Sequence, residues 1–411
     1  MMLKELFIVY VQKKYSKFFG IIFVILFLIF SSPFSFATSN IDSLVNNAIE
    51  ISLVHLVNSV NEVGDTTLFP TYGTKDLKWQ LKPATEWTAG FYPGCLWYAY
   101  KLSGDKRFKN WAEQWTNSLE YEKNDTTTHD LGFKFMSSFG NGIKFDKALA
   151  NGSYKKIILQ SANTLANRYN SKIKCLSSNW DMKPVNNSYP VIIDIMMNLE
   201  LLFWASENGD SAKLADYARN HAEVTARDFI RPDGSTYHIV RYDKSTGKVI
   251  NKGTLQGAGD ETTWARGQAW GIYGFTVAYR YTKEKQFLHD AIKLSDYFFK
   301  HLPPDNIAPW DFQSNIQFRD VSASCIVASA LFELIKYIKN DSLKNFYKSK
   351  AEAMLKSLCC APYFTGKKNT NCLLDHSVQF LPINSNVDVP SIFADYFFLE
   401  TIYRYQHWKI K

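Results

Sequence analysis

The chain lacks the residues and motifs that define several large classes of protein. Its 411 residues include only 6 cysteines, 13 prolines and 20 glycines, which excludes a disulfide-rich scaffold and a collagen-like or proline-rich chain. Neither the GxxxxGK[ST] phosphate loop nor the GxSxG nucleophile elbow occurs. The 8 histidines form no HxxxH or HExxH pair, so we expect no metal site built by the protein and no cofactor.

Aromatic residues, by contrast, are abundant. The chain contains 11 Trp, 23 Tyr and 30 Phe, and apolar residues make up 46% of it, which excludes disorder and supplies a large core. Aromatic rings beyond the needs of a core are typical of carbohydrate sites. Acidic and basic residues are interspersed without a basic run, so we expect no nucleic-acid partner, although the net charge of +8 favours a modest attraction for acidic polymers.

The first 37 residues are expected to be an export signal. Lys13, Lys14 and Lys17 precede an apolar run at 18–30, and a small-x-small cleavage site follows at 35–37. The alternative is a membrane anchor, but the run is shorter than the about 20 residues that span a bilayer. Cleavage would remove four lysines and one glutamate and lower the net charge from +8 to +5. We therefore expect a periplasmic or secreted protein that starts at Thr38 and is not stably inserted in a membrane.

The cysteines leave two interpretations open. An exported protein can form disulfides, and Cys372 with Cys359 or Cys360 is the expected pair. Buried free thiols are the alternative, above all for Cys95 and Cys325, which lie within apolar segments.

A loose repeat predicts an all-α fold. Apolar residues at helical spacing flank short polar turns at 103–105, 151–153, 208–210, 282–284 and 339–341, as in helical hairpins. A first helix at about 43–60 and a last one at 392–405 would form a sixth hairpin, and six closed hairpins make an (α/α)6 barrel. The β-favouring stretch 236–250 predicts a β-hairpin inserted at the barrel mouth. Without an internal linker, 38–411 is expected to be one catalytic domain; an irregular helical array is the alternative.

Two segments place an aspartate at the start of an apolar run. Asp194 opens such a helix, and burial raises the pKa of a carboxyl, which suits a general acid near neutral pH. Asn198, on the same helix face, is expected to orient it. A structural aspartate bonded to a neighbouring helix stays an open alternative. For Asp130, the residues alone favour a helix N-cap.

The segment 262–273 combines a guanidinium with two indoles. Arg266 shares a helix face with Trp270 and follows Trp264 by two residues. Core packing explains one tryptophan, but this combination is typical of an anion site with aromatic walls. A further tryptophan, Trp87, lies in a glycine-rich loop that leads into a helix.

Together these segments resemble glycoside hydrolase family 88, the unsaturated glucuronyl hydrolases. The resemblance extends from about Trp87 to Glu400 and rests on stretches in the order and spacing of the family, at 87–105, 129–142, 191–206, 237–275, 309–313 and 376–400. It implies an (α/α)6 barrel that removes the 4,5-unsaturated uronic acid that a polysaccharide lyase leaves at the non-reducing end of an oligosaccharide.

The resemblance also implies roles for single residues. Asp194 is similar to the general acid/base of the family, and Asp130 to its second essential carboxylate. The sugar-contacting residues of the family match Trp87, Trp180, His238, Gln256, Trp264, Arg266 and Trp270. No pattern of Ser and Lys around Ser377 points to a sulfated neighbouring sugar, so the preference for sulfated substrates stays open.

Two other functions stay open on the sequence. An unsaturated rhamnogalacturonyl hydrolase has the same barrel and hydration chemistry but different subsite loops. A non-catalytic periplasmic oligosaccharide-binding protein would keep the tryptophans but has no need of Asp194 in an apolar helix, so burial of Asp194 beside Asp130 in one pit would favour an enzyme. The parent polysaccharide, the neighbouring sugar and the oligomeric state are not determined by the sequence.

Overall fold

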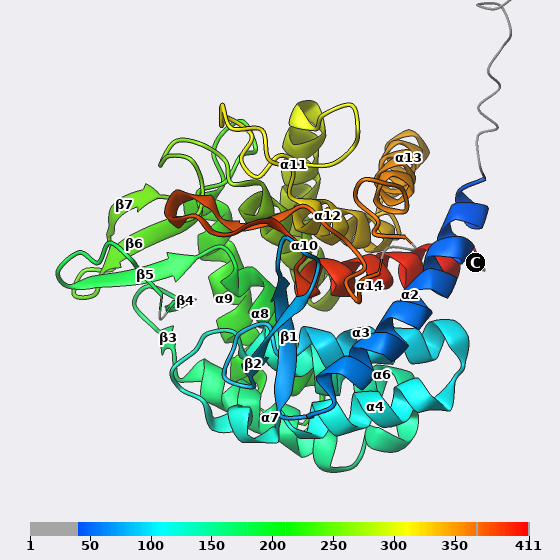
Figure 1. Cartoon of the computed structure of the whole chain (residues 1–411). Coiled ribbons are helices and arrows are strands. Elements are labelled where there is room, and N and C mark those ends of the chain that lie inside the picture. The colour runs from blue at the N-terminus through cyan, green and yellow to red at the C-terminus, as the bar shows by residue number, and fades with distance from the viewer. Residues whose placement is uncertain (1–39, 179, 210, 367–368, 410–411) are drawn as a thin grey trace, which may run out of the picture. The chain divides into compact units, whose positions relative to one another are not determined.

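The computed structural model describes residues 40–178, 180–209, 211–366 and 369–409 (Figure 1). Leu44–Lys411 forms one compact unit. The expected export signal, residues 1–37, lies outside the described residues. Within the described ranges, no helix is long and apolar enough to cross a membrane.

An inner ring of helices surrounds the axis of a barrel. Its members are α3 (Phe91–Ser103), α5 (Leu131–Phe135) with η2 (Met136–Gly140) and α6 (Asn141–Phe145), α8 (Ile195–Glu207), α10 (Ala265–Thr282), α12 (Val321–Leu334) and α14 (Ile392–Lys409). Each packs against the next, and α14 packs against α3, which closes the ring. Because neighbours cover these helices on all sides, α12 is buried along its whole length, as its almost uniformly apolar sequence requires.

An outer layer covers the ring. In the described part of the chain its helices are α2 (Ile41–Val63), α4 (Lys106–Asn117), α7 (Ser153–Ala166), α9 (Ala212–Phe229), α11 (Lys285–His301) and α13 (Asp341–Leu358). A residue of a hairpin turn can cap the helix that follows it. Asp105 accepts a hydrogen bond from the Arg107 N–H at 2.8 Å at the start of α4, and Asn340 caps α13. The Ser59 hydroxyl of α2 contacts the Tyr92 hydroxyl of α3 at 3.2 Å. The predicted (α/α)6 barrel is confirmed.

Short antiparallel sheets precede the inner helices. The predicted hairpin at 236–250 corresponds to β6 (Ile239–Asp243) and β7 (Val249–Gly253), which pair antiparallel, and β5 (Ser188–Ile192) pairs with β6 and extends the hairpin to a three-stranded sheet. The sequence did not predict the other pairs, which are β1 (Leu68–Gly73) with β2 (Trp79–Pro83), β3 (Tyr169–Asn170) with β4 (Cys175–Leu176), and β8 (Ser377–Phe380) with β9 (Ser385–Val389).

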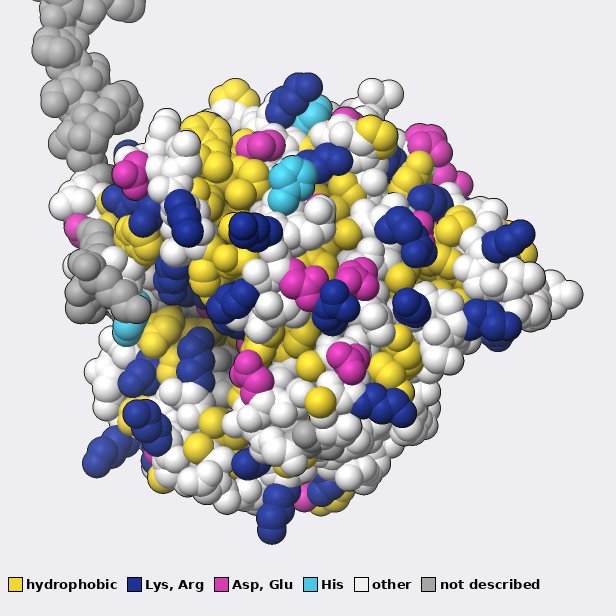
Figure 2. Space-filling model, turned by 180° about the vertical axis from the view of Figure 1, so that it is seen from behind, with side chains coloured by type: hydrophobic (Ala, Val, Ile, Leu, Met, Phe, Trp, Pro, Cys, Tyr) yellow, Lys and Arg dark blue, Asp and Glu magenta, His cyan; other side chains and the backbone are white. Residues whose placement is uncertain are grey.

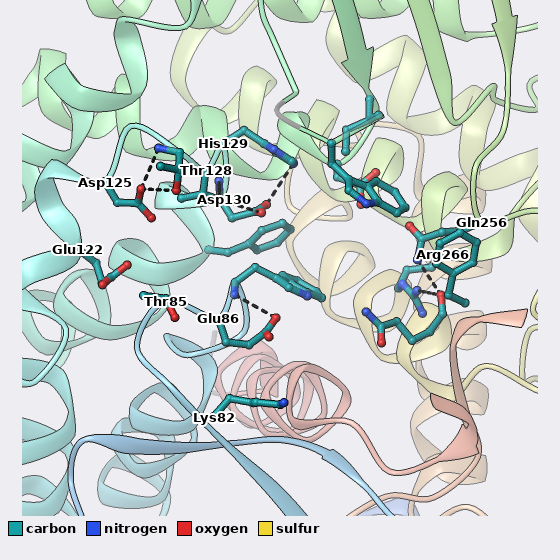
Figure 3. A pocket seen from close by; sticks show the side chains of 18 of the residues that line it. Lys82, Thr85, Glu86, Glu122, Asp125, Thr128, His129, Asp130, Gln256 and Arg266 are labelled. Atoms are coloured by element: carbon teal, nitrogen blue, oxygen red, sulfur yellow. Dashed lines mark hydrogen bonds and ion pairs between the residues drawn. The ribbon is translucent and has the colours of Figure 1, made fainter. Parts of the chain in front are cut away.

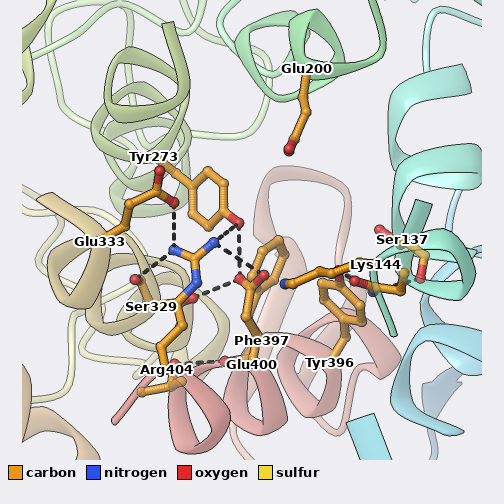
Figure 4. A network of polar contacts seen from close by, with 12 residues as sticks. Ser137, Lys144, Glu200, Tyr273, Ser329, Glu333, Tyr396, Phe397, Glu400 and Arg404 are labelled. Atoms are coloured by element: carbon orange, nitrogen blue, oxygen red, sulfur yellow. Dashed lines mark hydrogen bonds and ion pairs between the residues drawn. The ribbon is translucent and has the colours of Figure 1, made fainter. Parts of the chain in front are cut away.

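A buried ionic network joins three of the inner helices (Figure 4). The Arg404 guanidinium lies 3.2 Å from both Glu333 and Glu400. Glu400 also accepts hydrogen bonds from Ser329 at 2.6 Å and from Tyr273 at 3.0 Å. The network therefore connects α10, α12 and α14 inside the barrel, where an unpaired charge would be costly.

All six cysteines are free thiols. The predicted disulfide between Cys372 and Cys359 or Cys360 is therefore wrong. The Cys372 thiol instead donates to the Leu77 carbonyl at 3.4 Å, which brings it against a different segment of the chain. Cys95 and Cys325 are fully buried, as the alternative interpretation expected.

The surface carries charges of both signs. On the face seen in Figure 2, lysine and arginine side chains lie among acidic and apolar ones and do not gather into one patch.

Candidate active site

A cavity of about 790 Å³ lies among the loops that precede the inner helices. Seven of the nine predicted site residues line it: Trp87, Asp130, Trp180, Asp194, Gln256, Trp264 and Arg266. The other two, His238 and Trp270, are buried behind its wall. In Figure 3, Glu86 and Asp130 face Gln256 and Arg266 across the cavity. Segments far apart in the sequence thus bring the predicted residues together.

Asp194 lies where β5 passes into α8, and 15% of its side-chain surface is exposed. Removal from bulk water raises the pKa of this carboxyl from 3.8 to about 7, with a second contribution from the negative charge of Asp130; Arg266 acts in the opposite direction. The carboxyl is thus suited to give and take a proton near neutral pH.

The neutral imidazole of His238 lies beside the Asp194 carboxyl and directs an N–H group toward it. Burial lowers the pKa of its imidazole to about 3. Its Nδ1 accepts hydrogen bonds from the backbone N–H groups of Leu255, at 3.1 Å, and Gln256, at 3.3 Å. The proton of the neutral ring therefore sits on Nε2. This atom lies 3.5 Å from Asp194 Oδ2, farther than in a normal hydrogen bond.

Asp130 occupies the N-cap position of α5, but its side chain makes no capping hydrogen bond. The carboxylate accepts a hydrogen bond from the Thr128 hydroxyl at 3.2 Å and lies 3.4 Å from His129 Nε2. The interpretation of Asp130 as a helix cap is therefore wrong, and the acceptor for the first turn of α5 comes from elsewhere in the chain.

Asn198 does not play the expected part of orienting the Asp194 carboxyl. Its Oδ1 accepts a hydrogen bond from the backbone N–H of Phe133 at 2.9 Å. Its Nδ2 points to the backbone carbonyl of Asp194 at 3.5 Å. The sequence correctly placed Asn198 on the helix face of Asp194, but the partner of its amide belongs to α5, which is distant along the chain.

Aromatic side chains form the walls of the cavity. The Trp180 ring lies 5.6 Å from Phe380 and 6.1 Å from the His238 ring. The Trp264 ring lies 4.5 Å from the His238 ring. Trp270 packs behind the wall, 5.1 Å from Phe133. Trp87, Trp180 and Trp264 thus border the cavity with aromatic rings.

Arg266 is held by internal partners that the sequence did not predict. Its Nη1 donates to Asp320 at 2.9 Å and to the Val378 carbonyl at 2.6 Å, and its Nη2 donates to the Gln379 carbonyl at 2.8 Å. The guanidinium also lies over the Trp264 ring, 4.7 Å from its centre. Arg266 thus anchors β8 to α10 at the cavity wall.

Glu86, which lines the cavity, and Lys134, which lies behind it, were not predicted from the sequence. Glu86 accepts a hydrogen bond from the Trp87 N–H at 3.2 Å, and burial raises the pKa of its carboxyl. Lys134 is fully buried and bonds Glu122 at 2.7 Å and the Thr85 carbonyl at 3.0 Å, which ties α5 to the Trp87 loop. Glu86 immediately precedes the stretch 87–105 and Lys134 lies within the stretch 129–142, and these positions were the only signal in the sequence.

Among the described residues, no group of three or more His, Cys, Asp or Glu side chains is placed to hold a metal ion.

An (α/α)6 barrel with a protonatable aspartate in an aromatic cavity is an arrangement that suits a glycoside hydrolase. No family model matches the chain. It is 41% identical over 335 residues to an unsaturated glucuronyl hydrolase of Formosa agariphila, a match that covers 80% of this chain and 82% of the relative. It is also 34% identical over 350 residues to an unsaturated chondroitin disaccharide hydrolase of Streptococcus pyogenes, covering 83% and 86% of the two chains.

A solved structure supports the same assignment. The crystal structure of an unsaturated glucuronyl hydrolase specific for heparin has a TM-score of 0.84 and 36% identity, and the match covers 90% of this chain and 99% of that one. The chain belongs to the unsaturated glucuronyl hydrolases, glycoside hydrolase family 88.

Proposed function

We propose that the cavity binds the 4,5-unsaturated uronic acid at the non-reducing end of a lyase-generated oligosaccharide and releases it by hydration of the double bond. The observation that carries the proposal is the protonatable Asp194 beside Asp130 in one aromatic cavity. A protein that only binds sugars gains nothing from a carboxyl with a pKa of about 7, whereas a general acid requires one.

The unsaturated uronic acid contains a vinyl ether, which determines the order of steps. Asp194 donates its proton to C4, and positive charge develops at C5 and the ring oxygen. Asp194, now ionised, accepts a proton from the water that adds to C5. The resulting hemiketal opens and expels the rest of the oligosaccharide, so one water is consumed and the double bond is lost. Because attack is not at the anomeric carbon, the rule that relates carboxylate separation to retention or inversion does not apply.

Asp130 and His238 support this reaction in different ways. Asp130, as a carboxylate, stabilises the positive charge at C5 or holds the sugar hydroxyls, so unlike surroundings divide the roles of the two carboxyls. The Nε2–H of His238 faces Asp194. We assign it the role of a hydrogen-bond donor that stabilises the ionised form of Asp194 or binds a substrate oxygen between the two side chains.

The remaining residues of the cavity bind the sugar. Trp87, Trp180 and Trp264 offer ring faces, while Trp270 packs behind Phe133. The Gln256 amide donates to the Gln379 carbonyl at 2.7 Å and leaves its oxygen for the sugar. We assign Arg266 a mixed role, in which its charge draws the uronate and its internal bonds hold the wall.

A screen of lyase-generated disaccharides tests the proposal. Turnover is followed by the loss of ultraviolet absorbance of the C4=C5 bond, and the saturated disaccharide of the same composition serves as control. We expect turnover of unsaturated glucuronides only. Turnover of unsaturated rhamnogalacturonan fragments alone would favour the rhamnogalacturonyl alternative, and cleavage of saturated glucuronides would refute vinyl-ether chemistry.

We further propose export of the protein through cleavage of residues 1–37. The lysines ahead of a short apolar run support this proposal. Sequencing the N-terminus of the protein from the periplasmic and extracellular fractions tests it, with Thr38 as the expected first residue. Recovery of the chain with an intact N-terminus from the cytoplasm would contradict it.

A further inference from the structure

The short helix α5 begins at the second carboxylate, and its first turn needs hydrogen-bond acceptors. The first N–H groups of any helix have no partner within the helix. An aspartate in the N-cap position usually supplies one, by accepting from the second or third N–H. Asp130 holds this position, yet its side chain makes no such bond.

The acceptor comes from α8 instead. Asn198, which is fully buried, accepts the Phe133 N–H through Oδ1 at 2.9 Å. Phe133 is the third residue of α5, the one that an N-cap side chain would serve. Asn198 therefore accepts the hydrogen bond at the start of α5 that the Asp130 side chain would accept as an ordinary N-cap.

Close packing of the two backbones makes this contact possible. A Cβ atom at Gly132 would lie 2.4 Å from the Asn198 Cα and 2.7 Å from its Oδ1. Only glycine lets α5 approach α8 closely enough for the amide of Asn198 to reach the Phe133 N–H.

The contact lies about one helical turn below both carboxyls. Asp194 immediately precedes α8, and Asn198 follows it by four residues. Asp130 immediately precedes α5, and Phe133 follows it by three residues. Since the Asn198 Nδ2 also points to the Asp194 carbonyl at 3.5 Å, one side chain contacts the backbones of both helix starts.

We propose that Asn198 is a positioning residue that caps α5 from α8, and that this leaves the Asp130 carboxylate free to face the substrate. The proposal rests on the proposed function. Without Asn198, the side chain in the N-cap position is the usual acceptor for the third N–H of a helix, and in α5 that side chain is Asp130. Its carboxylate would then turn toward the helix and leave its place in the cavity.

Kinetics of Asn198→Ala, Asp130→Asn and the double variant test the proposal. We expect Asn198→Ala to lower kcat by about 10- to 100-fold, the scale of a misplaced catalytic group. If Asn198 acts only through Asp130, adding Asn198→Ala to Asp130→Asn should lower kcat no further. A merely structural role would lower kcat by the same factor in both backgrounds, and that result would overturn the proposal.

Asn141→Ala provides a matched control. Asn141 is also a buried asparagine, and its amide donates to the Ser137 carbonyl at 2.9 Å and to the Tyr396 hydroxyl at 3.0 Å. It does not line the catalytic cavity, so this variant should keep kcat. If Asn198→Ala does not fold, Asn198→Leu keeps the side-chain volume while removing the acceptor, and the same comparison applies.

The outcomes separate the two proposals. If Asp130→Asn keeps full activity, the role of Asp130 in the proposed function is wrong. If Asp130→Asn is inactive while Asn198→Ala and Asn198→Leu both keep kcat, the proposed function stands and the positioning role of Asn198 is refuted.

Discussion

Replacement of Asp194 by asparagine tests the central step of the reaction. The change keeps the size and shape of the side chain but removes the proton that the vinyl ether needs. Because general acid/base catalysis contributes about 10² to 10⁴ in rate, we expect kcat to fall by that factor. Folding and substrate binding should stay nearly intact, since the cavity keeps its walls.

The raised pKa shows why this position matters. With a pKa of about 7, roughly half of the Asp194 carboxyls carry a proton at pH 7. At the usual value of 3.8, the protonated fraction would be on the order of one in a thousand. Burial, by raising the pKa, thus accounts for most of the protonated Asp194 that is present near neutral pH.

The same pKa predicts how stability changes with pH. The folded chain holds the Asp194 proton up to about pH 7, whereas the unfolded chain loses it near pH 3.8. The wild type therefore loses stability relative to Asp194→Asn as pH rises between these values, by about 4 kcal/mol at most. The melting temperature of the variant should exceed that of the wild type at neutral pH and match it below about pH 4.

Both effects are measured on one preparation. The absorbance of the C4=C5 bond reports kcat, and thermal unfolding at several pH values reports stability. Asp290→Asn is the matched control, because burial also raises the pKa of Asp290 but this residue lies on the outer helix α11. A variant of Asp194 that keeps more than about a tenth of the wild-type kcat would refute its role as general acid.

Three further predictions concern other parts of the molecule. Hydrolysis in heavy-oxygen water should place the label at C5 of the released sugar, and mass spectrometry that finds it at C1 would indicate an ordinary glycosidase. Arg266→Lys should lose about 1.5 to 3 kcal/mol in denaturant unfolding, because a single ammonium nitrogen cannot take the places of both guanidinium nitrogens that bond Asp320 and the two carbonyls; unchanged unfolding would contradict this. Glu400→Gln should cost about 1.5 to 3 kcal/mol, because Arg404, Ser329 and Tyr273 lose a charged acceptor while Glu333 still pairs with Arg404, yet kcat/KM of the folded enzyme should stay unchanged; a lower kcat/KM would place this network in catalysis.

Local sequence determined the helices of this protein. Apolar residues at helical spacing on both sides of short polar turns predicted the helical hairpins, because this spacing places the apolar side chains on one face of a helix. The turn residues, such as Asp105 and Asn340, predicted where outer helices begin, since their capping bonds span only two or three residues. Asp194 was also visible locally, because a carboxyl at the head of an apolar helix is unusual.

Tertiary structure decided which partner each polar side chain found. Phe133 obtains its acceptor from Asn198, 65 residues away, so Asp130 did not become the cap that its position suggests. Arg266 donates a hydrogen bond to the Val378 carbonyl, 112 residues away along the chain. The sequence pattern of a single helix cannot predict such a partner. The spacing of apolar residues along the chain indicates which side chains are buried. The partner of a buried polar side chain depends on which other segment the closed barrel brings within about 3 Å of it.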